Sequence, residues 1–496
     1  MNRVQSSLLN YEEWVRRSLI WVVMYFTAEW LALDPAAITD ADIWSHLRTG
    51  EWIVRHHWVP YTDPFSSYGL GHSWVAYSWL FEVLVFGLHH LFGLVGLLAF
   101  VCIMVLAITA GLHALIRKFE PRVANAVLLT AFGLIAMAPL YTPRPWLFTI
   151  LLFIIELNIL IGVRNSRNYG RLFLLPLLFA LWANLHIQFV LGFSVLCIAA
   201  FEAPIVRLLG KIQVTVGEER GLPPLRVVLV ILACLVAALA NPYHFRIYAV
   251  VLDYLRQPSL YGLVKEFAAM DFRIAPNWLV LFMTLSAAFA LGRQSLLRPF
   301  WILLLVTAVF VSFRSGRDVW FVVIIAAAVI SSSRPITSVS KARMPSLAQA
   351  LFIIAALGIL LLPIVQVQHI SESNLQIAVA RTYPVSAANF VEERGYPGPL
   401  YNHFDWGSYL IWRLPNLPVS IDGRTNVHDV ERTRRSIRVW SGMRDWASDS
   451  ELSASRLVIA EKDVPLTQLL RLDNRFELVY EDEVAVVFIS RNTPTN

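Results

Sequence analysis

The sequence predicts an α-helical polytopic membrane protein that crosses the bilayer about eleven times and carries a small C-terminal α/β domain. Two observations lead to this fold class. Apolar residues make up 57% of the chain and charged residues only 15%, whereas a soluble domain contains about 25% charged residues. The apolar residues are also grouped into runs of about 16–22, long enough to cross hydrocarbon as helices. These runs recur from Leu19 to Val365 and stop after Val367.

We therefore expect a transmembrane domain at residues 1–366, with a long first external loop at 34–74, and a second domain at residues 367–496. The second domain has about 130 residues, an ordinary size for one small fold. All three cysteines lie inside apolar runs, without metal-ligand or disulfide spacing. They are interpreted as packing residues.

Loops of two kinds alternate along the transmembrane domain. Loops of the first kind are short and basic, for example at residues 117–122 and 334–343, and the positive-inside rule places them in the cytoplasm. Loops of the second kind are rich in His, Asn, Asp, Trp and Pro, and they are residues 34–74, 141–146, 184–188, 241–276 and 313–318. The alternation puts the second kind, and the C-terminal domain with them, on the extracytoplasmic side.

Residues 75–91 and 94–116 form two apolar segments that are separated only by Phe92-Gly93. The first segment contains Glu82, which favours a helix that is interfacial or partly buried. On this interpretation only the second segment crosses the bilayer. A hidden third crossing is the alternative.

The C-terminal domain is predicted to mix short helices and strands. Ser386–Arg394 and Val464–Leu472 have helical patterns. The runs that are expected to form strands are Ser408–Trp412, Pro418–Ile421, Leu457–Ala460 and Phe476–Ile489, the last of which is a hairpin. Asp422 and Arg424, in the sequence SIDGR, either bind an acceptor carbohydrate or pair within a packed turn.

The first external loop contains several acid–base residues. Asp40 and Asp42 form an Asp-Ala-Asp pair, and Asp42 and His46 are spaced so that they can share a helix face. A carboxylate at a membrane boundary can act as a general base on a hydroxyl or ligate a divalent cation. Asp40 has an equally good alternative as the N-cap of a helix that begins near Ala41. Asp63 stands in an Asp-Pro sequence, and turn formation is its alternative role.

Four stretches of the chain carry a resemblance to a known superfamily. They are DADIWSHLRTGEWI (40–53), WANLHIQFVLG (182–192), NPYHF (241–245) and YNHFDWGSYLIW…SIDGR (401–424). Together with an acidic pair just after the first transmembrane helix, they resemble the C-type glycosyltransferase superfamily, and within it a group of uncharacterised bacterial membrane proteins. The resemblance implies a polytopic enzyme that uses a polyprenyl-phosphate-linked sugar and often carries a soluble domain after its last helix.

The resemblance also implies roles for individual residues. Asp42, or Asp40, corresponds to the acidic residue that activates the acceptor, and the pair can hold a divalent metal ion. Cations in the external loops suit the phosphate of the donor, with snorkelling to lipid headgroups as the alternative. These cations are Arg144, Arg246, Arg314 and Arg317. His46, Asp63 and His186 complete the predicted substrate site, although a histidine at a helix end, such as His186, is more often simply hydrogen-bonded at the interface.

We therefore predict a glycosyltransferase of the bacterial plasma membrane. It moves a sugar from a polyprenyl-phosphate donor to a hydroxyl of a glycan, lipid or protein acceptor, with inversion at the anomeric carbon. The sequence has no Walker or Gly-rich nucleotide motif, so no nucleotide cofactor is expected. It also lacks basic stretches interleaved with aromatics, so nucleic acid is not an expected partner.

Two other classes of function stay open at this point. Glu156 stands in the middle of an apolar run, and an ionisable residue at that depth favours a transporter or flippase of a lipid-linked or small polar molecule. A non-catalytic scaffold subunit of a membrane assembly would tolerate loss of the acidic pair, whereas the enzyme would not.

Overall fold

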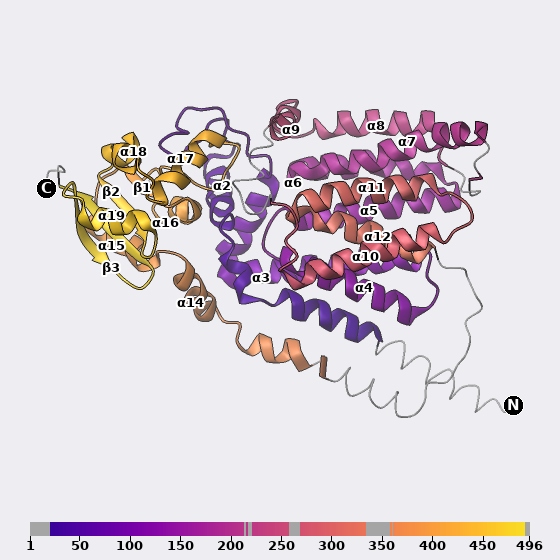
Figure 1. Ribbon diagram of the computed structural model, residues 1–496, viewed down its shortest axis with the longest axis horizontal. Coiled ribbons are helices and arrows are strands. Elements are labelled where there is room, and N and C mark those ends of the chain that lie inside the picture. Colours follow the sequence, from indigo (N-terminus) through magenta and orange to yellow (C-terminus); the bar gives the residue numbers. More distant parts are fainter. Residues whose placement is uncertain are drawn as a thin grey trace. The chain divides into compact units, whose positions relative to one another are not determined.

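The computed structural model describes residues 20–212, 215–216, 221–256, 268–333, 358–359 and 361–491. The chain divides into two compact units, whose elements are labelled in Figure 1. Unit 1 consists of Met1–Asp34, Leu98–Asn241 and Val264–Ile370, and unit 2 consists of Pro35–Leu97, Pro242–Leu263 and Ser371–Asn496. Residues 35–74 of the predicted first external loop and the C-terminal segment thus belong to one unit, whereas the sequence suggested a single division at residue 366.

Unit 1 is a bundle of apolar helices. Besides the helix at residues 20–32 and the second half of α3 (Trp79–Arg117), its main helices are α4 (Val123–Met137), α5 (Trp146–Ser166), α6 (Leu174–Leu185), α7 (Val190–Lys211), α8 (Pro224–Ala238), α10 (Ala275–Gly292), α11 (Pro299–Arg314) and α12 (Val319–Ser332). α12 lies against α4, α10 and α11 (Figure 1), and 12 of its 14 residues are buried. A helix that is apolar all round belongs inside a bundle, and α12 takes that place.

Five helical segments in the described part of the chain are long and apolar enough to cross a membrane. They are Trp79–Arg117, Val123–Leu140, Trp146–Ser166, Ile187–Lys211 and Ala275–Gly292. Three further apolar helices, Tyr169–Leu185, Pro224–Ala238 and Pro299–Arg314, are shorter. These helices identify a multi-pass membrane protein. The predicted number of about eleven crossings is not confirmed, because several apolar runs form helices of 17 residues or fewer.

α3 contains both of the apolar segments that the sequence separates at Phe92-Gly93. The helix is broken at Gly93, whose φ of 63° and ψ of −151° are non-helical and are reached almost only by glycine. The carboxylate of Glu372 accepts hydrogen bonds from the backbone N–H groups of Leu94 and Val95, at 2.8 and 3.3 Å. Glu372 therefore caps the helix that restarts after the break, because these N–H groups have no partner within a helix.

Unit 2 brings together segments that are far apart in the sequence. The first external loop contributes η1 (Pro35–Thr39) and α2 (Ile43–His56), and the residues after Asn241 contribute α9 (Arg246–Arg256). The C-terminal segment contributes α14 (Glu372–Thr382), α15 (Val385–Arg394), α16 (Gly407–Arg413), α17 (Val430–Trp440), α18 (Ser450–Ala454) and α19 (Pro465–Leu472). Trp44 of α2 packs edge-on against Tyr409 of α16, with ring centres 5.2 Å apart, and Tyr409 stacks on Tyr383 at 5.0 Å.

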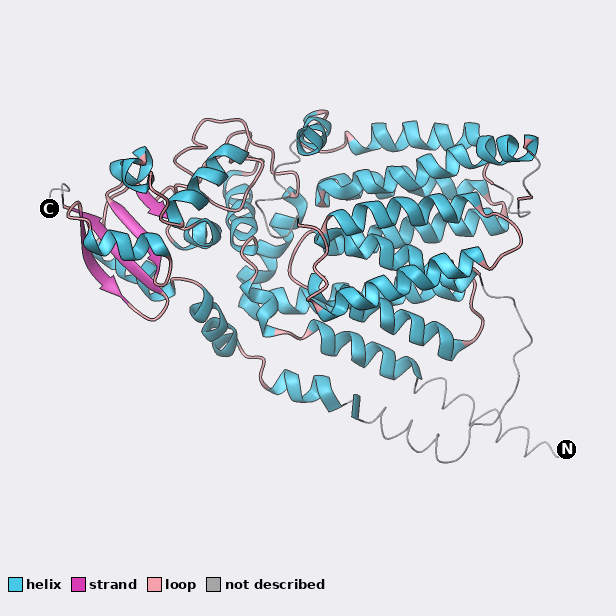
Figure 2. Ribbon diagram, viewed as in Figure 1, coloured by secondary structure: helices cyan, strands magenta, loops and turns pink. Residues whose placement is uncertain are grey.

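The C-terminal segment contains a four-stranded mixed sheet, drawn in magenta in Figure 2. Its strands are β1 (Leu400–Asn402), β2 (Leu457–Glu461), β3 (Phe476–Glu481) and β4 (Ala485–Ser490), in the order β1-β2-β4-β3. β1 runs parallel to β2, whereas β2 with β4 and β3 with β4 are antiparallel. β3 and β4 form the predicted hairpin, with an irregular register between Leu478 and Tyr480.

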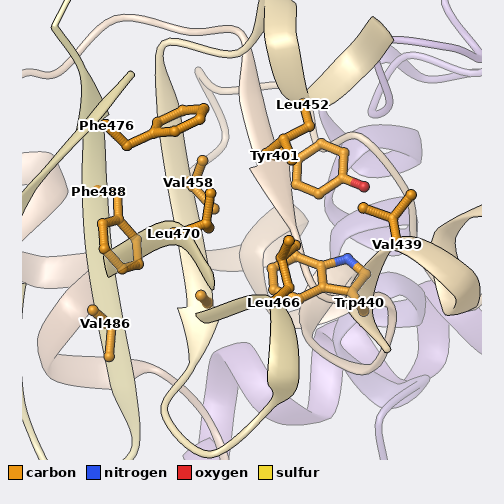
Figure 3. Packing of buried hydrophobic residues seen from close by; sticks show 11 residues of the cluster. Tyr401, Val439, Trp440, Leu452, Val458, Leu466, Leu470, Phe476, Val486 and Phe488 are labelled. Carbon is orange, nitrogen blue, oxygen red and sulfur yellow. The ribbon is translucent and has the colours of Figure 1, made fainter. Parts of the chain in front are cut away.

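Figure 3 shows the apolar cluster packed against this sheet. Leu466 and Leu470 of α19 pack with Val458 of β2 and Phe488 of β4, and Trp440 of α17 stacks on Tyr401 at 5.5 Å between ring centres. The buried residues of α17 include Val439 and Trp440, and those of α19 include Leu466 and Leu470, as expected for surface helices that cover a sheet with one face. The core of this domain therefore lies between the sheet and α17 and α19.

Two of the predicted strands are wrong. Ser408–Trp412 lies within the helix α16, and Pro418–Ile421 joins no strand of the sheet. Within the described residues, Val419 instead exchanges backbone hydrogen bonds with the first external loop, donating to the carbonyl of Phe65 at 3.2 Å and accepting from Ser67 at 2.9 Å. The helices at Ser386–Arg394 and Val464–Leu472 and the strand at Leu457–Ala460 are confirmed as α15, α19 and β2.

Candidate functional site

Asp40 and Asp42 stand at the beginning of α2, and both are partly buried. Oδ1 of Asp40 accepts a hydrogen bond from the backbone N–H of Asp42 at 3.1 Å. This local bond is typical of aspartates that start a turn. The predicted N-cap role of Asp40, for a helix beginning near Ala41, is wrong, because α2 begins at Ile43 and its N-cap position is occupied by Asp42. Asp42 occupies the N-cap position, but its side chain makes no capping hydrogen bond. The carboxylate of Asp42 therefore does not cap the N-terminus of α2.

The carboxylate of Asp42 lies next to the backbone that follows α16. A Cβ atom placed on Gly423 would be only 2.6 Å from Oδ1 of Asp42. A Cβ atom on Gly407, at the start of α16, would be 2.0 Å from the carbonyl oxygen of Ile421. Gly423, in SIDGR, therefore allows the C-terminal segment to pack closely against the predicted base, and Gly407, in FDWGS, allows α16 to pack against the Ile421–Asp422 backbone that precedes Gly423.

His46 has Glu82 of α3 as its partner. Nδ1 of His46 lies 3.1 Å from Oε1 of Glu82, and the imidazole also packs edge-on against Phe81, with ring centres 5.1 Å apart. The side chain of Glu82 is 5% exposed. The sequence gave no signal for this pair, because the two residues lie 36 positions apart, and the interfacial or partly buried position of residues 75–91 stays a prediction.

Asp63 belongs to a buried ion-pair network with the segment after α16. Its Oδ1 lies 2.6 Å from Nη1 of Arg424, and Arg424 also binds both oxygens of Asp422, through Nε and Nη2 at 2.8 Å each. Nε2 of His428 lies 3.0 Å from Oδ2 of Asp422. Asp63 further accepts backbone bonds within its own turn, so the turn-forming alternative is present. Its part in substrate binding stays a prediction.

The charges of this network explain why it tolerates burial. Burial alone would raise the pKa of Asp422, but Arg424 and His428 more than offset this effect and hold that pKa well below its usual range. Burial alone would lower the pKa of Arg424, and Asp422 and Asp63 raise it instead. One guanidinium thus lies between two carboxylates, and the pairing of Asp422 with Arg424 within a packed turn is confirmed.

The arginines predicted to bind phosphate in unit 1 stand at helix ends. Arg314 is the last residue of α11 and is exposed, and Arg317 lies in η7 (Gly316–Asp318), with its Nε 4.0 Å from Oδ1 of Asp318. Gln188, in the turn after α6, donates to the same oxygen at 2.5 Å. The loops after α6 and α11 are thereby joined.

His186 and Arg144 are both buried in unit 1. Nδ1 of His186 lies 2.8 Å from the hydroxyl of Thr149, which also accepts a bond from the indole of Trp182 at 2.9 Å. This is the hydrogen-bonded histidine of the alternative interpretation. The guanidinium of Arg144 lies over the ring of Trp146, 4.9 Å from its centre. The donor-binding roles of both residues stay predictions.

The predicted site residues are divided between the units. Asp40, Asp42, His46, Asp63 and Arg246 belong to unit 2, and Arg144, His186, Arg314 and Arg317 belong to unit 1. Glu156 of α5, which favoured a transporter, is fully buried, and neither of its carboxylate oxygens has a hydrogen-bond partner among the described residues.

The described ranges of the chain contain no group of three or more His, Cys, Asp or Glu side chains placed to hold a metal ion. Asp40 and Asp42 are the two ligands that the sequence suggested. Two carboxylates are enough only for an ion such as Mg²⁺, which keeps waters or substrate phosphates among its ligands. The residues present fit an ion of this kind and not an all-protein metal cage.

Comparison with known proteins shows a likeness of fold. No family profile and no curated protein matches the sequence. Among solved structures, the chain is similar to the archaeal oligosaccharyltransferase AglB from Archaeoglobus fulgidus, in complex with an inhibitory peptide and a dolichol-phosphate, with a TM-score of 0.55 and 11% identity over 91% of this chain and 70% of that one.

A second structure from Archaeoglobus fulgidus, an oligosaccharyltransferase in complex with Zn and sulfate, matches with a TM-score of 0.50 and 11% identity, over 95% of this chain and 73% of that one. In both comparisons the alignment runs through nearly the whole of the present chain. The chain therefore shares the fold of archaeal oligosaccharyltransferases.

Proposed function

We propose that this chain is a membrane glycosyltransferase. It moves a sugar from a polyprenyl-phosphate-linked donor to a hydroxyl of a glycan, lipid or protein acceptor, on the extracytoplasmic face of the bacterial plasma membrane. The observation that carries the proposal is the fold, which is similar over 91% of the chain to an oligosaccharyltransferase whose structure contains a peptide and a dolichol-phosphate. A fold alone does not fix an activity, so the chemistry is argued from individual residues.

Asp42 is the proposed general base. Its carboxylate makes no capping bond to α2 and lies against the backbone at Gly423. In the proposed reaction, the acceptor hydroxyl transfers its proton to Asp42 while its oxygen forms a bond to the anomeric carbon. The bond from that carbon to the phosphate oxygen breaks, and the polyprenyl phosphate leaves with the electron pair. A single displacement of this kind inverts the anomeric configuration.

The departing phosphate carries negative charge that cations stabilise. Arg314, Arg317, Arg144 and Arg246 are the proposed cations, because Arg presents several N–H groups that match phosphate oxygens. A divalent metal ion, if one takes part, would be held by Asp40 and Asp42 and would supply further charge stabilisation. A crystal structure of a protein with this fold contains Zn and sulfate, which supports testing divalent ions.

Replacing Asp42 with Asn tests the proposal directly. Asparagine keeps the size of the side chain but removes its basicity, and a positioned base contributes about 10²- to 10⁴-fold in rate. We expect sugar transfer from a pool of lipid-linked donors to fall by about that factor, while the purified protein keeps its thermal stability. Full activity of Asp42→Asn would remove Asp42 from the mechanism.

Asp40→Asn is the matched control. If Asp40 only shapes the turn before α2, its replacement costs about 1 kcal/mol of local stability and leaves transfer largely intact. If it ligates a metal ion, activity falls and excess divalent cation partly restores it. Loss of activity in Asp40→Asn alone would mean that the base is Asp40. If both variants function normally in cells and the wild type shows no transfer in vitro, the alternative of a non-catalytic scaffold subunit would be favoured.

The donor site is tested separately with Arg314→Gln combined with Arg317→Gln. Each charge-assisted hydrogen bond to phosphate contributes about 1.5–3 kcal/mol, so binding of a polyprenyl phosphate should weaken at least tenfold. The control is the pair Arg207→Gln and Arg293→Gln, which removes two arginines from the predicted cytoplasmic side and should leave binding unchanged. Equal binding by both double variants would exclude Arg314 and Arg317 from the donor site.

A further inference from the structure

Unit 2 contains a cavity of about 350 Å³ whose lining includes, among the residues of the proposed mechanism, only Arg246. It lies between α9, the end of the first external loop and the residues that follow Arg424. We propose that this cavity binds a neutral saccharide unit of the acceptor. This inference rests on the proposed glycosyltransferase function and specifies its acceptor as a glycan.

One face of α9 forms a wall of the cavity. The lining residues Arg246, Ala249, Val250, Asp253 and Tyr254 follow the spacing i, i+3, i+4, i+7, i+8, which places them on one side of a helix. The wall is polar at both ends and apolar in the middle. Arg246 and Asp253 are about 10 Å apart along the axis, at 1.5 Å per residue.

Hydrogen bonds hold this wall at both of its ends. Nη2 of Arg246 donates to the hydroxyl of Ser73 at 3.5 Å, and the hydroxyl of Tyr254 lies 3.2 Å from that of Thr425. On the third side, the amide of Asn426 donates to the carbonyl of Val75 at 3.0 Å. The cavity is thus preformed, and a ligand loses less free energy in ordering its site.

His428 lines the cavity and is only 1% exposed. Its Nε2 lies 3.0 Å from Oδ2 of Asp422. The same Nε2 lies 3.3 Å from the backbone nitrogen of Asp422, so both neighbours of this ring nitrogen belong to Asp422. Among the described residues, no group bonds to the other ring nitrogen, Nδ1. A buried ring nitrogen without a partner is unfavourable, and a ligand hydroxyl, which can donate or accept, would satisfy it.

The charges of the lining select the class of ligand. Arg246 is accompanied by two carboxylates, those of Asp253 and Asp429, so a phosphate or a carboxylated sugar would meet net negative charge. In this inference Arg246 therefore binds saccharide hydroxyls, in place of the phosphate role proposed for it above. The walls also offer apolar patches at Val75, Ala249, Val250 and Val427. Donors, acceptors and apolar patches in one small cavity suit a neutral saccharide, whose hydroxyls and C–H faces need all three. The volume is at the lower end of the range of about 300–1,000 Å³ for ligand sites.

The test uses the purified full-length protein in detergent and measures binding by calorimetry and saturation-transfer NMR. The neutral probes are maltose and N,N′-diacetylchitobiose, and the anionic probes are glucuronic acid and inorganic phosphate. Ala249→Trp fills the cavity from α9. The matched control is Leu252→Trp, on the same helix but outside the cavity, where Leu252 is 51% exposed.

At least one neutral probe should bind to the wild type and to Leu252→Trp, and its affinity should fall at least tenfold in Ala249→Trp. Asp253→Asn should improve the binding of glucuronic acid relative to the neutral probe. No neutral binding by the wild type, equal binding by Ala249→Trp, or preference for the anionic probes would overturn the inference. Binding of undecaprenyl phosphate is measured in the same variants. If the wild type binds the saccharide as expected but does not bind undecaprenyl phosphate, the result would count against the proposed transferase function and not against saccharide binding in the cavity.

Discussion

At the scale of single residues, the glycine at 423 is the clearest test of how Asp42 is positioned. A Cβ atom at this position would be 2.6 Å from Oδ1 of Asp42, so Gly423→Ala must displace the carboxylate. A displacement of about 1 Å can cost about 10²-fold in rate, whereas overpacking costs about 1–3 kcal/mol of stability. We expect sugar transfer to fall much more than the melting temperature.

The control is Gly87→Ala in α3, where a Cβ atom would meet nothing within 4 Å and where both transfer and stability should persist. Transfer by Gly423→Ala at the wild-type rate, in a protein that is equally stable, would show that the place of the Asp42 carboxylate does not matter to the reaction.

Individual residue roles were predictable only where they depend on neighbours in the sequence. The turn that Asp40 makes with Asp42 and the pairing of Asp422 with Arg424 are each formed over two positions. The sequence suggested the pairing, and it suggested a local role for Asp40, although as the N-cap that Asp42 occupies instead. The partner of Asp63 is Arg424, 361 positions away. No local pattern announces such a pair, so its existence depends on the tertiary fold.

At the scale of elements, Glu372 of α14 is expected to stabilise the helix that restarts after Gly93. Its carboxylate accepts bonds from Leu94 and Val95, and loss of a helix cap costs about 0.5–2 kcal/mol. Glu372→Ala should therefore lower the stability of the purified protein by that amount and speed hydrogen exchange at Leu94 and Val95.

Glu393→Ala is the control, because Glu393 is an exposed carboxylate on the neighbouring α15. It should change neither measurement. Equal exchange at Leu94 and Val95 in wild type and Glu372→Ala would mean that the hydrogen bonds of Glu372 contribute nothing to the restarted helix.

The errors in the predicted elements have a tertiary cause. SYLIW in Ser408–Trp412 is rich in residues that favour strands, yet it lies in α16, where Tyr409 packs against Trp44 and Tyr383. Conversely, the hairpin and α19 are correct because their alternating and helical patterns agree with their environment. Where packing and local preference disagree, packing decides.

At the scale of the whole molecule, the topology is still a prediction. The alternation of basic and motif-rich loops places residues 34–74, 241–276 and 370–496 outside the cytoplasm. Single cysteines in these segments, in a chain whose three native cysteines are replaced by alanine, should react with an impermeant maleimide on intact cells. A cysteine at Ser338, which lies outside the described residues, should not react.

Labelling at position 338 with no labelling in the C-terminal segment would reverse the orientation. It would also place the acidic pair of the first loop on the cytoplasmic side, where the proposed donor site would need a different access route. The number of membrane crossings is a separate question, because length and composition do not decide whether the shorter apolar helices, such as Pro224–Ala238 and Pro299–Arg314, cross the bilayer.

The division into units was the least predictable feature. Hydropathy separates apolar runs from the remainder and so finds a boundary near residue 367, but it carries no information on which polar segments fold together. Residues 35–97 and 242–263 join Ser371–Asn496 in one unit through contacts such as those of Asp63 with Arg424 and of Tyr254 with Thr425.

This discontinuity constrains the order in which the protein matures. Synthesis runs from the N-terminus, so the residues of the turn at Asp63 are made long before Val419 and Arg424, which bond to that turn. Contacts of such long sequence separation form late. Until then Asp63 of the first external loop lacks the cation that Arg424 supplies, and the backbone groups of Phe65 and Ser67 lack their bonds to Val419. A chain that stops near residue 370 would insert its helices but would leave this loop exposed, and it would be a natural substrate for quality-control proteases.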